Sequence, residues 1–265
     1  MANAFEVEDV RYEYGQISAL QGLSLSVPHG RRIALLGANG SGKSTLLRLL
    51  AGLSFPAGGH IRFCGDELSK ARLDEQEFFF HFRRKVGVVF QNPDVQLFNA
   101  NVFDELAFGP LQMGWPAQKV RERVNETLRE LRIEDLKDRA PHRLSGGEKK
   151  RVAIGSVLVL DPEVLLLDEP TAALDPASQT QIVELLASWK DSGRTVVIAT
   201  HDMDALEDIA DHCYLLKDGQ LAGEGDPLGV LHDIALLERT GLIRPHTHTH
   251  GHVHAHAHAT DDSSR

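Results

Sequence analysis

The sequence of 265 residues has few cysteines and lacks a long apolar run. Cys64 and Cys213 are far apart and have no metal-ligand spacing, so we expect reduced, buried thiols in a cytosolic protein and no disulfide framework. The longest apolar runs, such as 164–167 and 196–199, are too short to span a bilayer. Residues 1–9 are acidic and lack the apolar core of a signal peptide. If the protein works at a membrane, we expect another chain to supply the membrane-spanning part.

The chain also lacks an excess of positive charge. Its formal net charge is −10 with histidine neutral, whereas nonspecific nucleic-acid binding needs a basic field. We therefore expect no nucleic-acid partner. The hydrophobic fraction of 42% is ordinary for a soluble protein and suits one large domain, or one domain with an inserted subdomain.

Residues 37–45, GANGSGKST, fit the phosphate-binding pattern G-x-x-x-x-G-K-[ST]. Glycines let the backbone approach a polyphosphate, and the loop N–H groups form an anion site at a helix N-terminus. The flanking segments predict a buried strand at 32–36 and a helix at 46–51, although a glycine-rich turn could match by chance. In such a loop Lys43 reaches the β- and γ-phosphates and Ser44 binds Mg²⁺. The candidate nucleotide contacts are Asn39, Gly40, Ser41, Gly42, Lys43, Ser44 and Thr45.

The remaining pattern predicts an α/β fold in which strand-rich segments bracket a helical insertion. Strand patterns occur at 5–10, 23–27, 60–63, 85–90, 164–167 and 195–199, and a hairpin pattern at 211–222. Helical patterns occur at 116–133, at 146–160, at 176–190 after Asp175 as an N-cap, and within 227–242. Residues 74–85 contain three consecutive phenylalanines, which cannot share one helix face. We expect them to pack in an irregular segment, and exposure of some of them to a partner is the alternative.

Two carboxylates, Asp168 and Glu169, follow the apolar strand at 164–167. Carboxylates at the end of a buried strand are costly unless a cation receives them. We expect Asp168 to bind Mg²⁺ through water, and Glu169 to orient and deprotonate an attacking water. Two surface acids are the alternative. His201 follows another strand at the same predicted sheet edge, where it could contact the γ-phosphate.

The segment LSGGEKKR, residues 144–151, comes just before a predicted helix. Ser145 would cap this helix, and the glycines would expose its first N–H groups to an anion. The segment therefore reads as a second phosphate site without its own lysine. An ordinary capped helix is the alternative, but it does not explain why the cap is so rich in glycine.

Together these motifs resemble the ATP-binding-cassette (ABC) ATPases over about residues 4–224. The matching features, in order, are Tyr14, residues 37–45, Gln91, the signature LSGGE at 144–148, residues 164–169, residues 172–175 and His201. The resemblance implies a P-loop NTPase core with an antiparallel β-subdomain and an inserted helical subdomain at about 91–160. It also implies ATP and Mg²⁺ as cofactors, ATP hydrolysis, and a head-to-tail homodimer in which each ATP lies between one P-loop and the other signature.

The resemblance further implies a role for each site residue. Tyr14 would stack on adenine, with Tyr12 as its rival. Ser145 and Gly147 would contact the γ-phosphate across the dimer, and Asp175 would link the two sites. The implied catalytic residues are Glu169, His201 and Gln91, and the implied Mg²⁺ ligands are Ser44, Gln91 and Asp168.

A narrower resemblance, at 90–98 and 104–111, is to the energy-coupling-factor importers of vitamins and transition metals. Generic helical-subdomain sequence is the alternative. In that branch this region docks a transmembrane coupling subunit, which works with a substrate-binding membrane subunit. The resemblance therefore implies a peripheral protein at the cytoplasmic face of the cell membrane. Residues 225–245 resemble the short C-terminal helical extension of the same branch, which can add dimer contacts.

Residues 246–265 form a low-complexity tail in which histidine alternates with other residues. Near neutral pH most imidazoles are unprotonated and can bind metal, and in an extended chain this spacing places them on one face. We expect a disordered tail that binds Co²⁺ or Ni²⁺, although imidazole does not select a metal and Cu²⁺ or Zn²⁺ would bind at least as well as Co²⁺. Incidental metal binding by a solvated tail is the alternative. The candidate ligands are His246, His248, His250, His252, His254, His256 and His258.

The sequence thus predicts the ATPase subunit of an energy-coupling-factor-type importer for cobalt or nickel. A vitamin importer with an incidental tail is one alternative. A soluble ABC ATPase without a transporter and a metal-storage protein with a vestigial ATPase are two others.

Overall fold

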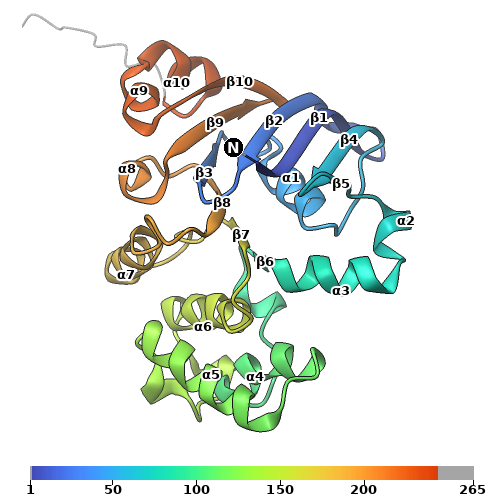
Figure 1. Cartoon of the computed structure of the whole chain (residues 1–265). Coiled ribbons are helices and arrows are strands. Elements are labelled where there is room, and N and C mark those ends of the chain that lie inside the picture. The colour runs from blue at the N-terminus through green and yellow to red at the C-terminus, as the bar shows by residue number, and fades with distance from the viewer. Residues whose placement is uncertain (1, 244–265) are drawn as a thin grey trace, which may run out of the picture.

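The first strands of the chain build an antiparallel sheet. In the computed structural model, which describes residues 2–243, this sheet has the strand order β2-β1-β4-β5. Its strands are β1 (Asn3–Tyr14), β2 (Ile17–Pro28), β4 (Gly58–Phe63) and β5 (Asp66–Glu67). The buried rings of Phe5 and Phe63 pack together across it, with centroids 5.2 Å apart. Figure 1 shows this sheet at the upper right, beside α1 (Lys43–Leu50).

The second sheet has six strands in the order β10-β9-β3-β8-β7-β6. They are β3 (Arg32–Leu36), β6 (Val86–Val89), β7 (Val164–Asp168), β8 (Thr195–Thr200), β9 (His212–Lys217) and β10 (Gln220–Gly225). All pairings are parallel except the predicted β9–β10 hairpin. In register, Leu36 pairs with Thr200 and Asp168 pairs with Ala199. The segments after β3, β7 and β8 therefore meet at one edge, where ligands of parallel sheets bind.

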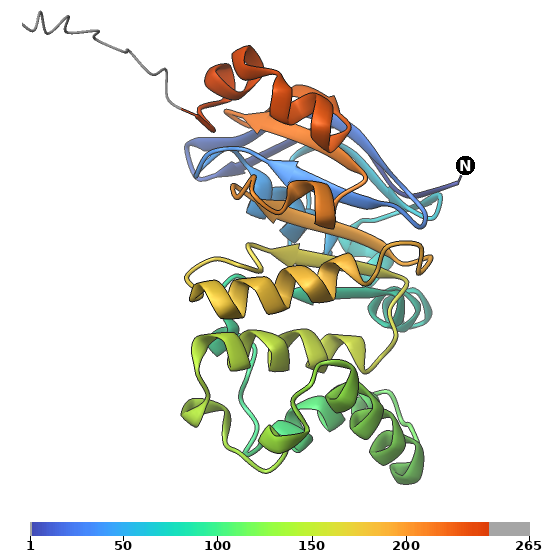
Figure 2. The same ribbon diagram turned by 90° about the vertical axis from the view of Figure 1, so that its left-hand side faces the viewer.

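Helices cover both faces of the parallel sheet and form a separate layer at one end. Besides α1 they are α2 (Lys70–Leu73), α3 (Gln76–Lys85), α4 (Val102–Gln112), α5 (Ala117–Glu130), α6 (Gly146–Leu158), α7 (Pro176–Ala187), α8 (Leu206–Ile209), α9 (Pro227–His232) and α10 (Ile234–Thr240), with 3-10 turns η1 (Pro93–Val95), η2 (Glu134–Leu136) and η3 (Pro141–Arg143). Figures 1 and 2 show α4, α5 and α6 at the end of the molecule opposite α9 and α10. None of the helices within residues 2–243 has the length and apolarity needed to cross a bilayer.

The core is divided by the parallel sheet into two clusters, and β3 contributes to both. Ile33 and Leu35 pack with the antiparallel sheet and α1, whereas Ala34 and Leu36 pack with the helical layer and α7. Side chains alternate along a strand, and both faces of this sheet are covered, so every residue of β3 is buried. This explains why residues 32–36 read as a continuous apolar run and not as an alternating one.

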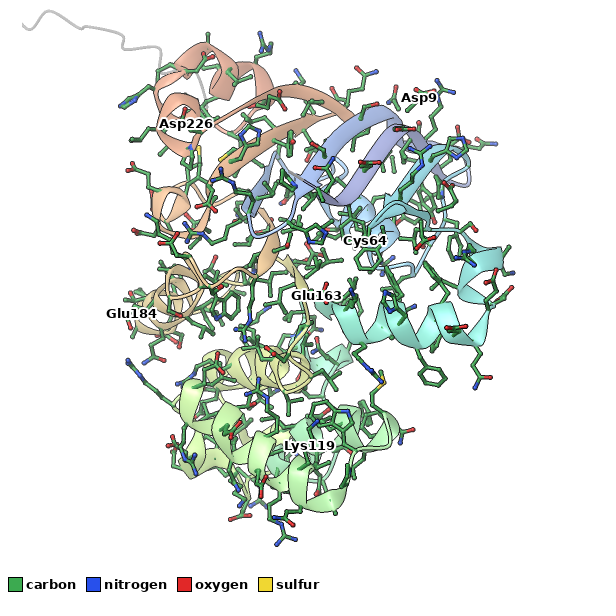
Figure 3. The ribbon with its side chains drawn as sticks, in the orientation of Figure 1. Asp9, Cys64, Lys119, Glu163, Glu184 and Asp226 are labelled. Carbon is green, nitrogen blue, oxygen red and sulfur yellow. The ribbon has the colours of Figure 1, made fainter. Side chains whose placement is uncertain are left out.

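Two predictions made from the sequence are wrong. The three phenylalanines lie in α3 and not in an irregular segment: only Phe78 has to face the core, where it stacks on Phe82, and Phe79 and Phe80 remain 37% and 42% exposed. Cys64 is exposed, whereas Cys213 is buried as predicted. Cys64 sits in the turn after β4 with a φ of +50°, where its sulfur lies 3.7 Å from Nε2 of His29 and stays exposed. Figure 3 labels this residue beside the sheets.

Candidate functional site

The phosphate-binding loop connects β3 to α1, as predicted. Gly42, the residue before α1, has a φ of +106°, and a Cβ there would lie 2.8 Å from the carbonyl oxygen of Ala19. Only glycine fits such a position. The N–H groups in the first turn of α1 have no carbonyl partner within the helix, so they are available to an anion. The local backbone thus fits a polyphosphate.

Lys43 supplies the positive charge of the loop. Its ammonium group donates to the carbonyl oxygens of Gly37 at 2.7 Å and Ala38 at 3.3 Å, and it lies 3.8 Å from Glu169 Oε1. Burial lowers the pKa of Lys43, while the charges of Glu169 and Asp168 act to raise it. The lysine is therefore held over the loop between carbonyl and carboxylate oxygens.

Ser44 and Asp168 form an oxygen-rich pair at the sheet edge. The Ser44 hydroxyl donates to Asp168 Oδ1 at 2.9 Å, which connects the start of α1 with the end of β7. Burial raises the pKa of Asp168, although the Ser44 hydrogen bond and the charge of Lys43 oppose that shift. Hydroxyl and carboxylate oxygens are ligands that Mg²⁺ prefers, and a cation would relieve the cost of the buried carboxylate. These residues therefore fit a bound magnesium ion.

Glu169 is turned into the same site by its backbone. It has a φ of +45°, unusual for a residue with a side chain, and its N–H donates to the carbonyl of Ala199 at 2.9 Å. The side chain is almost fully buried, and Oε1 lies 2.9 Å from Nδ1 of His201. Lys43 of the P-loop follows β3, Glu169 follows β7 and His201 follows β8. The structure therefore brings these three residues together at one edge of the parallel sheet, as predicted from the sequence.

A cavity of about 290 Å³ opens in front of these groups. It is lined by Tyr14, Ile17, Ser18, Ala19, Asn39, Gly40, Ser41, Gly42, Lys43, Ser44, Thr45, Gln91 and Glu169. Tyr14 is 43% exposed at its rim and packs edge-on against Tyr12, which is absent from the lining. This favours Tyr14 over Tyr12 as the residue beside a base. The buried Ser41 hydroxyl, which has no partner within the described chain, is a free polar group in the lining.

The second predicted phosphate site lies at the start of α6. Ser145 is its N-cap: the Ser145 hydroxyl accepts from the Glu148 N–H at 3.3 Å, and the Glu148 carboxylate accepts from the Ser145 N–H at 2.7 Å. The hydrogen bond from the Ser145 backbone is the main reason that the pKa of Glu148 is lowered. Among the described residues, neither Ser145 nor Gly147 lines the cavity at the P-loop. This helix end therefore lies outside the nucleotide cavity of its own chain.

Gly147 also has a packing role that the sequence did not reveal. A Cβ at this position would lie 2.2 Å from the Ser178 hydroxyl oxygen on α7. That hydroxyl donates to Asp175, the N-cap of α7, at 2.6 Å, and hydrogen bonds from Ser178 lower the pKa of Asp175. An ordinary packing constraint therefore accounts for one glycine of the cap, contrary to the sequence argument. The same contact places Asp175 next to the start of α6.

Two buried charged residues were missed from the sequence, one beside Gln91 and one in α4. Lys150, 1% exposed, donates to the main-chain carbonyls of Phe90 and Gln91. Burial lowers the pKa of Lys150 to about 8, although the charges of Asp168 and Glu169 act to raise it. Glu105, 3% exposed, accepts from the N–H groups of Phe98 and Asn99 at 2.9 and 2.7 Å. In the sequence both residues look like ordinary charges on helix surfaces, and no local signal marks them as buried.

The comparison with known families agrees with this geometry. A model of the ABC transporter family matches residues 20–172, more than half of the chain. The chain belongs to the ABC transporter family. This ABC protein is an ATP-binding and ATP-hydrolysing transport ATPase, and its fold is that of ABC ATPase cassettes, so the predicted fold class and enzyme class are confirmed.

Curated relatives of this ABC ATPase match over most of its length. A nickel import ATP-binding protein, NikO of Rhodobacter capsulatus, is 53% identical over 92% of this chain and 97% of its own. The cobalt import ATP-binding protein CbiO of the same organism is 43% identical, over 92% and 86%. The energy-coupling factor ATP-binding protein EcfA of Methanothermobacter thermautotrophicus is 42% identical, over 91% and 77%.

Two solved structures match this ABC ATPase closely. The cbiO1 protein of Clostridium perfringens, part of the transporter complex cbiONQ, has a TM-score of 0.78 at 38% identity, covering 91% of this chain and 96% of its own. A dimeric ATP-binding cassette in a post-hydrolysis state with ADP and phosphate has a TM-score of 0.75 at 29% identity, covering 84% and 98%. The predicted histidine ligands, residues 246–258, lie outside the described part of the ABC ATPase. Within residues 2–243 no group of three or more His, Cys, Asp or Glu side chains is placed to hold a metal ion.

Proposed function

We propose that this ATPase works as a head-to-tail homodimer that powers transition-metal import. The proposal of a dimer is supported by the separation of the P-loop site from the phosphate site at the start of α6. The start of α6 does not line the P-loop cavity of its own chain. A second copy, related by a two-fold axis, can bring its Ser145 and Gly147 to the γ-phosphate. The dimeric form of a related cassette supports this arrangement.

Within each site the residues divide the work of hydrolysis. The N–H groups of the P-loop and Lys43 bind the phosphates. Ser44, Asp168 and Gln91 would hold Mg²⁺, which would neutralise charge developing on the phosphate oxygens. Glu169 accepts the proton of the attacking water. His201 keeps the Glu169 carboxylate in place through their 2.9 Å contact, and we propose that it also contacts the γ-phosphate. Tyr14 stacks on the adenine ring, and Asp175 connects the two sites of the dimer.

An apolar surface next to Gln91 is the proposed docking site for a transmembrane coupling subunit. Val95 and Phe98 are 69% and 66% exposed, and Phe108 and Leu111 of α4 are 40% and 52% exposed. The Phe98 and Phe108 rings pack edge-on, with centroids 5.0 Å apart. Contiguous exposed apolar side chains mark interaction sites, and this surface coincides with the segments that resemble energy-coupling-factor ATPases. The protein then lies peripherally at the cytoplasmic face of the membrane, with a substrate-binding membrane subunit in the same complex.

The metal assignment rests on the relatives. NikO and CbiO are named for nickel and cobalt import, and NikO is 53% identical to this chain over nearly its whole length. We propose Co²⁺ or Ni²⁺ as the transported substrate, with the histidine tail as an accessory metal-binding segment.

Uptake of labelled Co²⁺ and Ni²⁺ tests this proposal. The ATPase and its membrane subunits are reconstituted in vesicles, with the full chain and with a chain lacking residues 246–265, and Glu169→Gln serves as the energy-deficient control. We expect uptake that depends on ATP and is absent with Glu169→Gln. Absence of uptake of both metals, with normal ATP hydrolysis, would refute the metal assignment and favour the vitamin importer. Equal uptake by the truncated chain would show that the tail is incidental.

A further inference from the structure

Lys150 is a buried cation whose partners are main-chain carbonyls. It lies in the second turn of α6, and its ammonium group donates to the carbonyl oxygens of Gln91 at 2.7 Å and Phe90 at 3.2 Å. Within residues 2–243 no carboxylate forms an ion pair with it. Burying a lysine without a paired carboxylate is costly, and an apolar side chain could fill the same space. Packing therefore does not account for this residue.

A second side chain ties the same loop to α6. The Gln96 amide donates to the carbonyl of Ala153 at 2.8 Å and to the Ser156 hydroxyl at 3.0 Å, and its oxygen accepts from the Phe90 N–H at 3.2 Å. The N–H and carbonyl groups of Phe90 are thus held by Gln96 and Lys150, respectively. Residues 90–96 come directly after β6 of the parallel sheet, but these hydrogen bonds attach them to α6. A movement of α6 would therefore move this loop.

Gln91 is the point where these contacts reach the nucleotide cavity, because it lines that cavity together with Lys43 and Glu169. We propose that Lys150 is a positioning residue that transmits the placement of the signature helix α6 to Gln91. Ser145 lies at the start of the same helix. When Ser145 engages the γ-phosphate of the partner's site, Lys150 moves Gln91 into place in its own site, so that each site senses the other. This inference rests on the proposed role of Gln91 and on the proposed dimer.

Two adjacent lysines provide a matched pair of variants. Lys150→Met removes the donors and the charge but keeps the length of the side chain. Lys149→Met is the control, because Lys149 pairs with Asp94, whose side chain is 63% exposed, and such pairs contribute little. In steady-state ATP hydrolysis by the full chain we expect Lys150→Met to lower kcat about 10–100-fold, the loss that misplaced catalytic groups cause. The KM for ATP should change less than about twofold, since Lys150 does not line the cavity. Lys149→Met should match the wild type, and Lys150→Arg, which keeps charge and donors, should recover part of kcat.

Amide hydrogen exchange gives a readout that does not depend on activity. We expect Lys150→Met to speed exchange in residues 90–98 and to leave residues 37–45 unchanged. Lys149→Met, which removes only the exposed pair with Asp94 from the same loop, should change exchange in residues 90–98 much less. If Lys150→Met does not fold, Lys150→Gln, which keeps amide donors without the charge, is measured in the same way. Unchanged exchange in residues 90–98, or a uniform increase over the whole chain, would refute the attachment of this loop to α6 through Lys150. Neither result would contradict the proposed role of Gln91 in hydrolysis.

A double-mutant cycle distinguishes whether Lys150 acts through Gln91 from whether Gln91 itself contributes to hydrolysis. If Lys150 acts through Gln91, Gln91→Ala lowers kcat and adding Lys150→Met lowers it little further. Independent, multiplicative losses would overturn the inference. A Gln91→Ala variant with wild-type kcat would refute the proposed role of Gln91 itself, and the transmission from α6 with it.

Discussion

Replacing Glu169 by glutamine removes the proposed base and preserves the shape of the side chain. Glu169 is 5% exposed, so the substitution acts in a buried environment and solvent does not compensate for it. A glutamine amide can still contact His201, and the Lys43 contacts with Gly37 and Ala38 remain. Nucleotide binding should therefore survive while proton transfer is lost.

The expected loss follows from the role of a general base. Removing such a group lowers kcat about 10²–10⁴-fold, equivalent to about 3–5 kcal/mol in the activation barrier. We expect the dissociation constant for ATP to change less than about tenfold, because the loop N–H groups and Lys43 supply most of the phosphate contacts. With hydrolysis blocked, ATP should hold two copies together, so that the variant elutes as a dimer with Mg·ATP and as a monomer without it.

The matched control is Glu163→Gln, at the opposite end of the strand β7. Glu163, labelled in Figure 3, has a side chain that is 51% exposed and pairs with Lys85 at 3.1 Å. An exposed pair is worth at most about 1 kcal/mol, so kcat should stay at the wild-type value. Phosphate release from ATP and size-exclusion chromatography measure both variants. A Glu169→Gln protein that hydrolyses ATP at the normal rate, or that stays monomeric with ATP bound, would refute the reasoning.

Three further predictions concern packing, a buried ion pair and the magnesium ligands. Gly147→Ala puts a methyl group 2.2 Å from the Ser178 hydroxyl oxygen and should cost about 1–3 kcal/mol of folding free energy in urea denaturation; adding Ser178→Ala should restore much of that loss, and no recovery would contradict the packing explanation. Asp211→Asn removes the negative charge from the 2.7 Å pair with the guanidinium of Arg32, which is 2% exposed, and should cost about 3–5 kcal/mol. Burial acts to raise the pKa of Asp211, but hydrogen bonds and charge from Arg32 outweigh burial and lower the pKa. The stabilisation by this ion pair is therefore complete above the unfolded pKa of about 3.9 and is lost as pH falls through the lower folded pKa. A melting-temperature profile from pH 7 to pH 2 that has the same shape in Asp211→Asn as in the wild type would contradict this pH dependence. Asp168→Asn should raise the Mg²⁺ concentration for half-maximal ATP hydrolysis about 10–100-fold, and a magnesium titration with an unchanged midpoint would exclude Asp168 as a ligand.

Much of the fold could be predicted from sequence because its signals are local. The strand at 32–36 was predicted with the bounds that β3 has, and Asp175 was identified as the N-cap that the structure shows. Apolar runs, caps and glycine patterns reflect interactions within a few residues, which neighbouring sequence encodes. The meeting of the P-loop, Glu169 and His201 was also predictable, since parallel strands end at one edge.

The sequence by itself determined the chemistry of this protein: a phosphate loop, acids after a buried strand, and a capped glycine-rich helix end. Only the tertiary structure decided which neighbouring side chains face inward. Lys149 and Lys150 are adjacent, yet one pairs with an exposed Asp94 and the other is buried against Phe90 and Gln91. Their partners lie between 55 and 60 positions away in the chain, so no local pattern distinguishes the two lysines. The side that each one faces depends on how α6 packs against the loop after β6, and that packing arises only when the whole chain is folded.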